Sequence, residues 1–337
     1  MKALVYSAVK EMAVRDVPEP SPRPEQAVVK VIGTGICGSD MSGFLGHSAR
    51  RQPPLILGHE VIGTVVHAPP GEWPFGVGDR VIANPIQACG ACAMCGSGQG
   101  NLCSDWKLLG MDREEGAFAE YVAVKAENLF PVPAGVSDQQ AVMVEPLANG
   151  VHLFNLISRH QFGSLAILGA GTQGILMLAL AGLHGYRDVI VVDTSAERLE
   201  IARTFGAAHL LNPSDGDAVD AILKRTGGVD ICIDAVGATA TRAAAIAATR
   251  KGGEILLLGL HDAVSALDIN LVVRKELKLQ GSFAYTSADL LTSKRLIESG
   301  AISIERWTET WPLESGQLAF DQLTTTPGST LKIVLKP

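Results

Sequence analysis

The second half of the chain alternates short apolar runs with segments in which apolar residues recur at helical spacing. This alternation begins near Ser164 and is typical of a parallel sheet with helices on both faces. One expected helix opens with Ser195 as N-cap and stops at Gly206. The expected strands are 165–168, 189–192, 231–234, 254–258 and 277–283, and the expected helices include 175–183 and 195–205. We therefore predict a doubly wound α/β domain that binds a nucleotide.

The first half is patterned differently, as short strand-like segments separated by frequent glycine and proline. Its expected strands are 27–32, 60–66, 79–82 and 119–124, so this half is predicted to be β-rich. The chain ends with a helical pattern over 315–323 and a strand-like segment at 332–335, which we expect to return to the first domain. The predicted organisation is a β-rich domain of residues 1–148 and 284–337 and a nucleotide-binding domain of residues 149–283.

Composition narrows the class of protein. The 337 residues suffice for two domains of about 150 residues each. With 47% hydrophobic and 19% charged residues, a disordered chain is excluded. The 28 basic and 35 acidic side chains give a net charge of −7, and basic residues form only short pairs such as Arg50-Arg51. Nucleic-acid binding is therefore not expected, and a small neutral or anionic ligand is favoured.

Two segments bear on location. The N-terminus lacks the apolar stretch and small-residue cleavage site of a secretory signal, so we expect a cytoplasmic protein. The longest stretch without charge, 161–185, is long enough for a membrane span, which needs about 20 apolar residues. Four glycines between positions 169 and 182 favour a buried strand, turn and helix instead. We therefore expect no association with a membrane.

A glycine-rich turn follows the strand expected at 165–168 and opens the next helix. In this pattern the first glycine allows a tight turn, the second lets the backbone approach a pyrophosphate, and the third lets helix and strand pack closely. The helix N-terminus then offers N–H groups to the phosphates. The turn reads Gly169-Ala170-Gly171-Thr172-Gln173-Gly174, and we count its glycines, Thr172 and Gln173 among the cofactor-binding residues.

Asp193 lies nineteen residues after the last glycine of this turn, at the end of the next expected strand. A carboxylate there can accept hydrogen bonds from both ribose hydroxyls and would repel a 2′-phosphate, so NAD is favoured over NADP. Arg198, in the following helix, is predicted to cover the adenosine. The alternative for Arg198 is a solvated surface cation.

Four of the six cysteines lie within fifteen residues, with the spacing C-x2-C-x2-C-x7-C. They are Cys89, Cys92, Cys95 and Cys103. Four thiolates on a short loop match the closed tetrahedral shell of a structural zinc. An iron–sulfur cluster and disulfides are the alternatives, although a ferredoxin run would end C-x3-C-P, which this one does not. Cys232 lies in an apolar strand and is expected to be an inert core thiol.

A second group of metal-ligand residues is scattered over three motifs: Cys37-Gly38-Ser39-Asp40, Gly58-His59-Glu60 and Glu145-Pro146. One thiolate, one imidazole and one or two carboxylates leave a position open for a water or a substrate oxygen, as a catalytic zinc requires. Each motif by itself is weak. Their joint occurrence upstream of a dinucleotide site points to catalysis.

The order of these motifs along the chain resembles that in the zinc-dependent medium-chain alcohol dehydrogenases. The same order includes Gly78-Asp79-Arg80-Val81, Glu145-Pro146-Leu147 followed by His152, and the glycine-rich turn. Within this family the chain is most similar to the polyol branch of sorbitol and galactitol-phosphate dehydrogenases. That assignment rests mainly on Glu145, where alcohol dehydrogenases proper carry cysteine. The resemblance implies a GroES-like β-rich catalytic domain joined to a Rossmann domain, with one catalytic and one structural zinc per chain.

The resemblance also implies roles for individual residues. Cys37 and His59 would hold the catalytic zinc, with Glu60 and Glu145 each either binding the metal or holding its water. Ser39 would relay the substrate proton, and NAD would lie between the domains at the carboxyl ends of the strands. Val236, Leu260 and Phe283, each at the end of an expected strand, are further candidates for contact with the nicotinamide, with core packing as the alternative.

The chain departs from the family in its expected substrate region. Ser42 stands where many relatives have the histidine that ends the proton relay, and His47 is one candidate to replace it. Sorbitol dehydrogenases carry an arginine before a tyrosine where this chain has Ala284-Tyr285, so sorbitol itself is not favoured. His47, Arg50 and Tyr285 are candidates for the substrate pocket. An anionic sugar derivative is one hypothesis, because arginine binds phosphate or carboxylate through two donors.

We therefore expect an NAD-dependent zinc enzyme that oxidises a secondary alcohol of a sugar, polyol or sugar derivative. A threonine or small-diol dehydrogenase of the same fold is one alternative, and a non-catalytic NAD-binding protein is another. The partner is a small molecule, and exposed sheet edges in the cofactor domain lead us to expect a homodimer or homotetramer.

Overall fold

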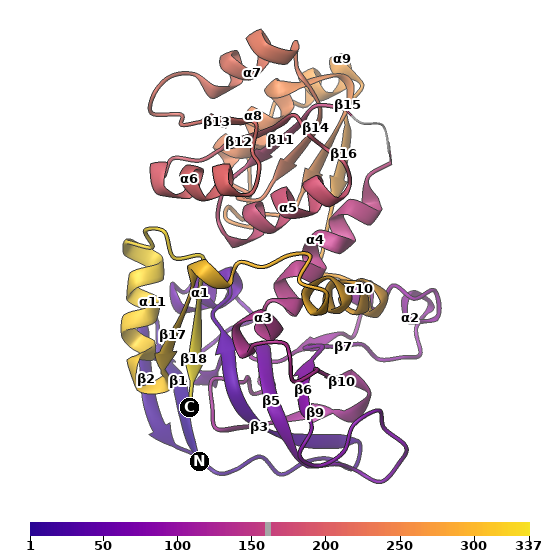
Figure 1. Cartoon of the computed structure of the whole chain (residues 1–337), viewed down its shortest axis with the longest axis vertical. Coiled ribbons are helices and arrows are strands. Elements are labelled where there is room, and N and C mark those ends of the chain that lie inside the picture. The colour runs from indigo at the N-terminus through magenta and orange to yellow at the C-terminus, as the bar shows by residue number, and fades with distance from the viewer. Residues whose placement is uncertain (159–162) are drawn as a thin grey trace. The chain divides into compact units, whose positions relative to one another are not determined.

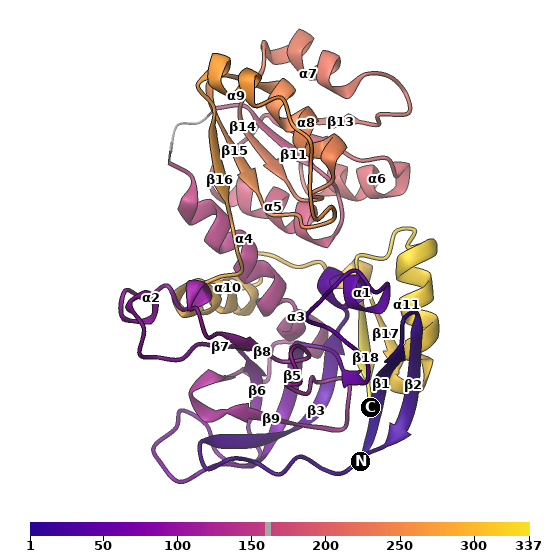
Figure 2. The same cartoon turned by 180° about the vertical axis from the view of Figure 1, so that it is seen from behind.

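The computed structural model describes residues 1–158 and 163–337, and the chain divides into two compact units. The first unit comprises Met1–Ala148 with Tyr285–Pro337, and the second comprises Asn149–Ala284. Figures 1 and 2 show the elements of each unit. Helix α4 (Val144–Leu156) carries the chain from the first unit into the second.

The main sheet of the first unit is seven-stranded, with the order β10-β6-β5-β3-β18-β17 and with β9 paired to β3. Its strands are β3 (Gln26–Gly35), β5 (Glu60–His67), β6 (Arg80–Ala83), β9 (Tyr121–Lys125), β10 (Leu129–Pro131), β17 (Thr308–Pro312) and β18 (Lys332–Lys336). Because β18 pairs antiparallel with β3, the C-terminal strands join a sheet whose other strands come from residues 26–131.

Smaller sheets and short helices surround this sheet. The strands are β1 (Lys2–Ala8), β2 (Glu11–Asp16) and β4 (Leu55–Ile56) in the order β2-β1-β4, and the pair β7 (Ile86–Gln87) and β8 (Lys107–Leu108). The helices are α1 (Gly38–Phe44), α2 (Ala93–Gly96), α3 (Asp138–Val142), α10 (Ser287–Glu298) and α11 (Gly316–Thr325). Four short 3-10 helices lie at Gly100–Leu102, Ala126–Asn128, Glu305–Trp307 and Leu313–Ser315.

One core of the first unit forms around Phe320 of α11. Its ring lies 5.1 Å from that of Phe44 and 5.9 Å from that of Phe118, the second pair meeting edge to face. All three rings are fully buried, in a cluster that also contains Leu4 and Tyr6 of β1. Aromatic pairs at such distances add to the free energy gained by burying apolar area. The segment that contributes Phe320 is thus part of the same core as the N-terminal strands.

The second unit has one parallel sheet in the order β13-β12-β11-β14-β15-β16. Its strands are β11 (Leu165–Leu168), β12 (Val189–Val192), β13 (His209–Leu211), β14 (Val229–Asp234), β15 (Thr249–Leu257) and β16 (Lys278–Gly281). The helices α5 (Thr172–Leu183), α6 (Ala196–Thr204), α7 (Ala218–Thr226), α8 (Thr239–Ala248) and α9 (Ile269–Lys275) lie on both faces (Figure 1). Strands β11 and β12 are buried along their whole length, which explains their uninterrupted apolar sequence.

The predicted fold class, a β-rich domain with a doubly wound domain, is confirmed. The strands expected at 165–168 and 189–192 match β11 and β12, whereas β15 begins five residues before its expected start and β16 ends two residues before its expected end. Strands β1, β2 and β13 were not expected from the pattern. Among the described residues no helix is both long and apolar enough to cross a bilayer. Residues 161 and 162, at the start of the uncharged stretch, lie outside the described residues.

Candidate active site and cofactor site

The cysteine and histidine candidates are brought together by the pairing of β3 with β5. Gly35, at the end of β3, pairs with Glu60, the first residue of β5. A side chain at position 35 would collide with the Glu60 carboxylate, so glycine allows this close approach. The ligand atoms of Cys37, His59 and Glu60 all lie within 4.8 Å of one another. The group is a candidate metal centre of one sulfur, one nitrogen and one carboxylate oxygen.

Asp40 connects the two strand ends that carry these ligands. Its Oδ2 accepts a hydrogen bond from the Cys37 N–H at 3.1 Å, and its Oδ1 lies 3.4 Å from His59 Nδ1. Although burial raises the pKa of Asp40, the charges of His59 and Arg51 lower it below its ordinary value. Burial lowers the pKa of His59, but Asp40 and Cys37 raise it well above its ordinary value. A carboxylate on one ring nitrogen leaves the other nitrogen to face a metal.

The two glutamates have different partners. Lys332 Nζ lies 2.7 Å from each carboxylate oxygen of Glu60, with both side chains buried. Glu145 Oε1 accepts a hydrogen bond from the Tyr285 hydroxyl at 2.7 Å. Burial raises the pKa of Glu145 to about 7, and burial beside this carboxyl raises that of Tyr285 well above its ordinary value. Glu145 is not part of the group gathered within 4.8 Å, so the choice between the two carboxylates as ligand stays a prediction.

The three candidates on and after α1 lie in different environments. Ser39 accepts a hydrogen bond from Arg51, which is buried. Arg50 instead pairs with Asp112 and lies 4.2 Å from the centre of the Trp106 ring. His47 is exposed on the loop after α1. The guanidinium that reaches this site is therefore that of Arg51, and the pocket roles of Arg50 and His47 stay predictions.

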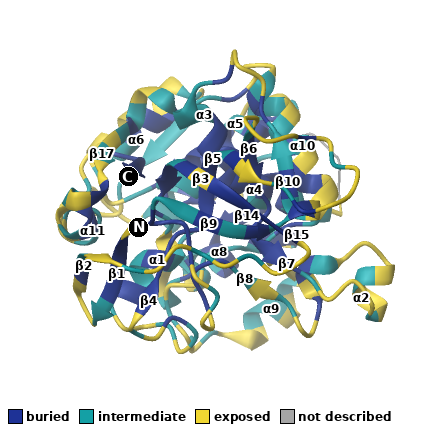
Figure 3. Cartoon of the chain, turned by 90° about the horizontal axis from the view of Figure 1, so that it is seen from below, coloured by how far each residue is buried: buried dark blue, intermediate teal, exposed yellow. Residues whose placement is uncertain are grey.

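The four sulfur atoms of Cys89, Cys92, Cys95 and Cys103 also lie within 4.8 Å of one another. They come from a loop around α2, a helix with no buried residue (Figure 3), whereas Cys103 at the end of the loop is buried. The backbone N–H of Cys95 lowers the pKa of the Cys92 thiol to about 6, toward the thiolate form that binds metals. This donor set fits a structural zinc. Cys232 is fully buried, and burial raises the pKa of its thiol, which agrees with an inert core residue.

The glycine-rich turn joins β11 to α5. Gly169 has φ +97°, a left-handed conformation that favours glycine, and a side chain at Gly174 would collide with the Gly169 carbonyl. The Asp193 carboxylate accepts hydrogen bonds from the N–H groups of Ala170 at 2.6 Å and Ser195 at 2.8 Å. It therefore lies beside the turn. Both features match the dinucleotide-binding geometry that the sequence predicts.

The other cofactor candidates also lie in the second unit. Val236 follows β14, and a Cβ at Gly169 would come within 2.5 Å of its Cγ2. Arg198 lies at the start of α6, with Nη1 3.9 Å from the position of a Cβ at Gly171. Leu260 and Phe283 follow β15 and β16 and are 79% and 40% exposed. Exposure argues against core packing for these last two, and their contact with a nicotinamide stays a prediction.

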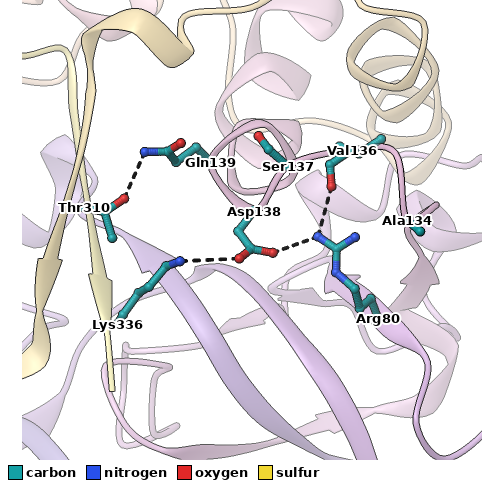
Figure 4. Close-up of a pocket in the computed structure, with 8 residues that line it drawn as sticks. All are labelled: Arg80, Ala134, Val136, Ser137, Asp138, Gln139, Thr310 and Lys336. Atoms are coloured by element: carbon teal, nitrogen blue, oxygen red, sulfur yellow. Dashed lines mark hydrogen bonds and ion pairs between the residues drawn. The ribbon is translucent and has the colours of Figure 1, made fainter.

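A surface cavity of about 540 Å³ lies elsewhere in the first unit (Figure 4). Within it Asp138, the first residue of α3, accepts a hydrogen bond from Arg80 at 2.7 Å and lies 3.4 Å from Lys336. Asp138 thus already pairs with both cations of the cavity, and none of the predicted site residues lines it.

Sequence reasoning missed three groups at the metal centre. Asp40 stands in the quoted Cys37 motif, so its spacing to the cysteine was a signal for it. Arg51 is adjacent to Arg50 in the sequence, and no local pattern distinguishes the two. Lys332 had no signal at all, because it lies 272 residues from Glu60.

Comparisons with known proteins agree with this geometry. Residues 23–134 match the alcohol dehydrogenase GroES-like domain, and residues 174–299 match the zinc-binding dehydrogenase family. Sorbitol dehydrogenase of Bacillus subtilis (strain 168) is 30% identical over 345 residues, which cover 100% of this chain and 97% of that protein. L-threonine 3-dehydrogenase of Pyrococcus abyssi (strain GE5 / Orsay) is 34% identical over 302 residues, which cover 88% of this chain and 86% of that protein.

Among solved structures, a protein described as a zinc-binding dehydrogenase from Sinorhizobium meliloti 1021, bound to NADP, has a TM-score of 0.90. It is 31% identical, and the match covers 100% of this chain and 99% of that one. The resemblance predicted from the motifs is thereby confirmed. The chain belongs to the zinc-dependent medium-chain alcohol dehydrogenases, in the branch that contains the polyol dehydrogenases.

Proposed function

We propose that this protein oxidises a secondary alcohol of a sugar, polyol or sugar derivative, with NAD as hydride acceptor. The observation that carries the proposal is the group of Cys37, His59 and Glu60, in which His59 and Glu60 are buried and Ser39 follows Cys37 by two residues. A relative named sorbitol dehydrogenase, matched along the whole chain, supports the substrate class.

The donor set at this centre fits a zinc ion that keeps a position open for substrate. Cys37 and His59 would hold it, with Glu60 or Glu145 as the further ligand or as the group that holds its water. A zinc ion bound there would act as a Lewis acid that polarises the substrate hydroxyl and lowers its pKa. The four cysteines around α2 would hold the second, structural zinc. Helix α2 within this loop has no buried residue, which supports a role for metal in ordering it.

The remaining steps belong to the chain's own side chains. Asp40 fixes the ring of His59 through Nδ1. Ser39, two residues after a ligand, accepts the substrate proton at Oγ and passes its own hydroxyl proton on to water or to a cofactor hydroxyl. Tyr285 holds Glu145 by its Oε1, so that this carboxylate keeps one orientation while substrate enters. NAD, when bound, supplies the hydride acceptor, and the protein contributes position and charge.

We infer a preference for NAD over NADP from Asp193. Its carboxylate lies beside the glycine-rich turn, where a 2′-phosphate would meet a like charge. The Sinorhizobium meliloti relative was solved with NADP, which makes a direct comparison of the two cofactors necessary.

A threonine or small-diol dehydrogenase is the second candidate function. The 34% identity to a protein named L-threonine 3-dehydrogenase favours it. Only the identity of the oxidised product separates it from the first, since fold, zinc ligands and cofactor are shared. A non-catalytic NAD-binding protein is the third candidate. The presence of all three residues Cys37, Ser39 and His59 argues against it.

The test is NADH formation at 340 nm across polyols, sugar phosphates, aldonates, diols and threonine, with each active compound repeated on Cys37→Ser. Turnover that Cys37→Ser abolishes would support zinc-dependent oxidation and name the substrate class. Binding of NAD without turnover on any compound would contradict the proposal and favour the non-catalytic alternative.

We further propose that the protein forms a homodimer or homotetramer through β16. This strand is an edge of the parallel sheet (Figure 2), all four of its residues are exposed, and Leu279 is 38% exposed. Val273 on α9 is another exposed apolar side chain of the same unit. An uncovered edge strand with apolar side chains is suited to pairing with a second copy.

A further inference from the structure

Arg51 is a buried cation at the metal centre. It is 5% exposed, and arginine is seldom so deeply buried unless it is paired. Its Nη2 donates to Ser39 Oγ at 3.1 Å, and its Nε lies 3.7 Å from Asp40 Oδ1. Its Nη1 lies 3.9 Å from the sulfur of Met111. One side chain therefore reaches both the candidate proton-relay hydroxyl and the carboxylate that holds His59.

Helix α1 is shaped to receive this side chain. A Cβ added at Gly43 would come within 2.8 Å of Arg51 Cδ and 3.0 Å of its Cβ. The aliphatic part of Arg51 thus lies directly against the helix that carries Ser39 and Asp40. Glycine at position 43 leaves the space that the arginine occupies.

Asp40 needs a permanent positive charge beside it. It is fully buried, accepts hydrogen bonds from the backbone of Cys37 at 3.1 Å and of Gly58 at 3.4 Å, and lies 3.4 Å from His59 Nδ1. A buried carboxylate without a cation is strongly destabilised. Arg51 supplies that positive charge, with Nε 3.7 Å from Asp40 Oδ1.

Ser39 receives a different effect from the same group. A guanidinium has only N–H donors, so Arg51 occupies one lone pair of Ser39 Oγ and can take no proton from it. The second lone pair and the hydroxyl hydrogen remain for partners on other sides. Ser39 can therefore pass a proton only to a group other than Arg51.

We propose that Arg51 is a positioning residue that orients Ser39 directly and His59 through Asp40. The inference rests on the proposed function for its kinetic consequences, but its effect on metal binding is independent of the substrate. It assigns Arg51 the role of joining the proton-relay residue to the metal ligands. Its sequence neighbour Arg50, which pairs with Asp112, has no such role in orienting these groups.

Zinc retention tests whether Arg51 orients His59 through Asp40. Arg51→Met keeps an apolar side chain of similar length and removes every donor. Zinc per chain is measured by mass spectrometry after dialysis against graded chelator, and the portion that depends on Cys37 is identified with Cys37→Ser. We expect Arg51→Met to bind this portion about 10- to 100-fold more weakly, as loss of a group that orients metal ligands does. Zinc bound by the four cysteines, and NAD binding, should not change.

A second variant, Arg51→Lys, tests whether Arg51 orients Ser39. Arg51→Lys keeps the charge beside Asp40 but has no planar fork to hold Ser39 as well. We expect it to retain zinc as the wild type does, while kcat falls about 10-fold and KM for NAD stays unchanged. The matched control is Arg23→Met, which removes an arginine paired on the surface with Glu114 and should alter none of these quantities.

The inference is overturned if Arg51→Met retains zinc and kcat within twofold of the wild type. It is also overturned if Arg51→Met loses the zinc of the four cysteines equally, because that would show a general loss of structure. A wild-type protein that oxidises no alcohol would contradict the proposed function alone. Zinc retention would still decide the role of Arg51 toward His59.

Discussion

Lys332 and Glu60 form a doubly hydrogen-bonded ion pair in the interior of the first unit, with Nζ 2.7 Å from both carboxylate oxygens. Lys332 also donates to the carbonyl of Ile36 at 2.9 Å, next to the metal candidate Cys37. The first residue of the last strand thus fixes both the carboxylate and the backbone at the metal centre.

Removing this lysine should be strongly destabilising. Lys332→Met leaves the Glu60 charge buried without its cation, which costs about 3–5 kcal/mol of unfolding free energy. Lys336→Met on the same strand removes an exposed lysine 3.4 Å from Asp138 and should cost at most about 1 kcal/mol. Urea unfolding of both variants measures the difference. Equal losses would contradict the view that Glu60 depends on Lys332.

The cofactor preference should depend on the carboxylate of Asp193. Asp193→Asn removes the charge that opposes a 2′-phosphate and weakens the acceptance of ribose hydroxyls. Hydrogen bonds to charged groups contribute about 1.5–3 kcal/mol, so we expect NADH to bind about 10- to 100-fold more weakly and NADPH no more weakly than before. Fluorescence titration of both nucleotides measures this. Asp188→Asn, at an exposed aspartate of the same unit, is the control, and tighter binding of NADPH than NADH by the wild type would refute the preference.

We expect two zinc ions per chain, one of them held by the four cysteines around α2. Cys95→Ser is expected to lose one zinc and to make that loop more susceptible to proteolysis, because no residue of α2 is buried. Cys232→Ala, which removes a thiol in the sheet of the second unit, should retain both ions. Elemental analysis of the purified variants provides the count. Two zinc ions in Cys95→Ser would exclude the four-cysteine site.

Asp230 should make stability depend on pH. Burial raises its pKa, but Arg250 and the N–H of Ser164 lower it below its ordinary value. Because the folded pKa is the lower one, the charged carboxylate stabilises the fold above the unfolded pKa of about 3.9, and this contribution is lost as pH falls below it. Asp230→Asn should lose about 1–2 kcal/mol at pH 7.

The difference between Asp230→Asn and the wild type should then shrink as the pH of the unfolding experiment is lowered toward 3. Asp220→Asn is the control, since Asp220 and Lys224 form an exposed pair on α7 whose removal should matter little. A difference that is the same at pH 7 and pH 3 would show that the charge of Asp230 is not what stabilises the fold.

The edge strand β16 should carry the subunit contact. Leu279→Lys places a charge on that edge and should shift the sedimentation coefficient of the protein toward that of a monomer. Leu318→Lys alters a 63% exposed leucine on α11 of the first unit and should leave the assembly unchanged. A monomeric wild type, or an unchanged Leu279→Lys, would reject β16 as the interface.

Spacing along the chain predicts those features of the protein that short-range patterns encode. The glycine-rich turn, the acid after the next strand and the four closely spaced cysteines are each set by short-range spacing, and their positions in the structure follow from it. Strands such as β11 and β12 were predictable because burial on both faces leaves an unbroken apolar sequence. Strands β2 and β13 were harder, because most of their residues are partly buried or exposed and the apolar signal is weaker. Strand β1 is buried from Ala3 to Tyr6, and its apolar run was not recognised as a strand.

Only the tertiary structure decided which charges meet at the metal centre. Arg50 and Arg51 are adjacent and chemically identical, yet one lies against Trp106 on the surface and the other is buried beside Ser39. Glu60 and Lys332 lie 272 residues apart and meet because β18 pairs with β3, which pairs with β5. A side chain's partners depend on strand order and on the direction in which the chain enters the core. Spacing along the sequence does not record either of these.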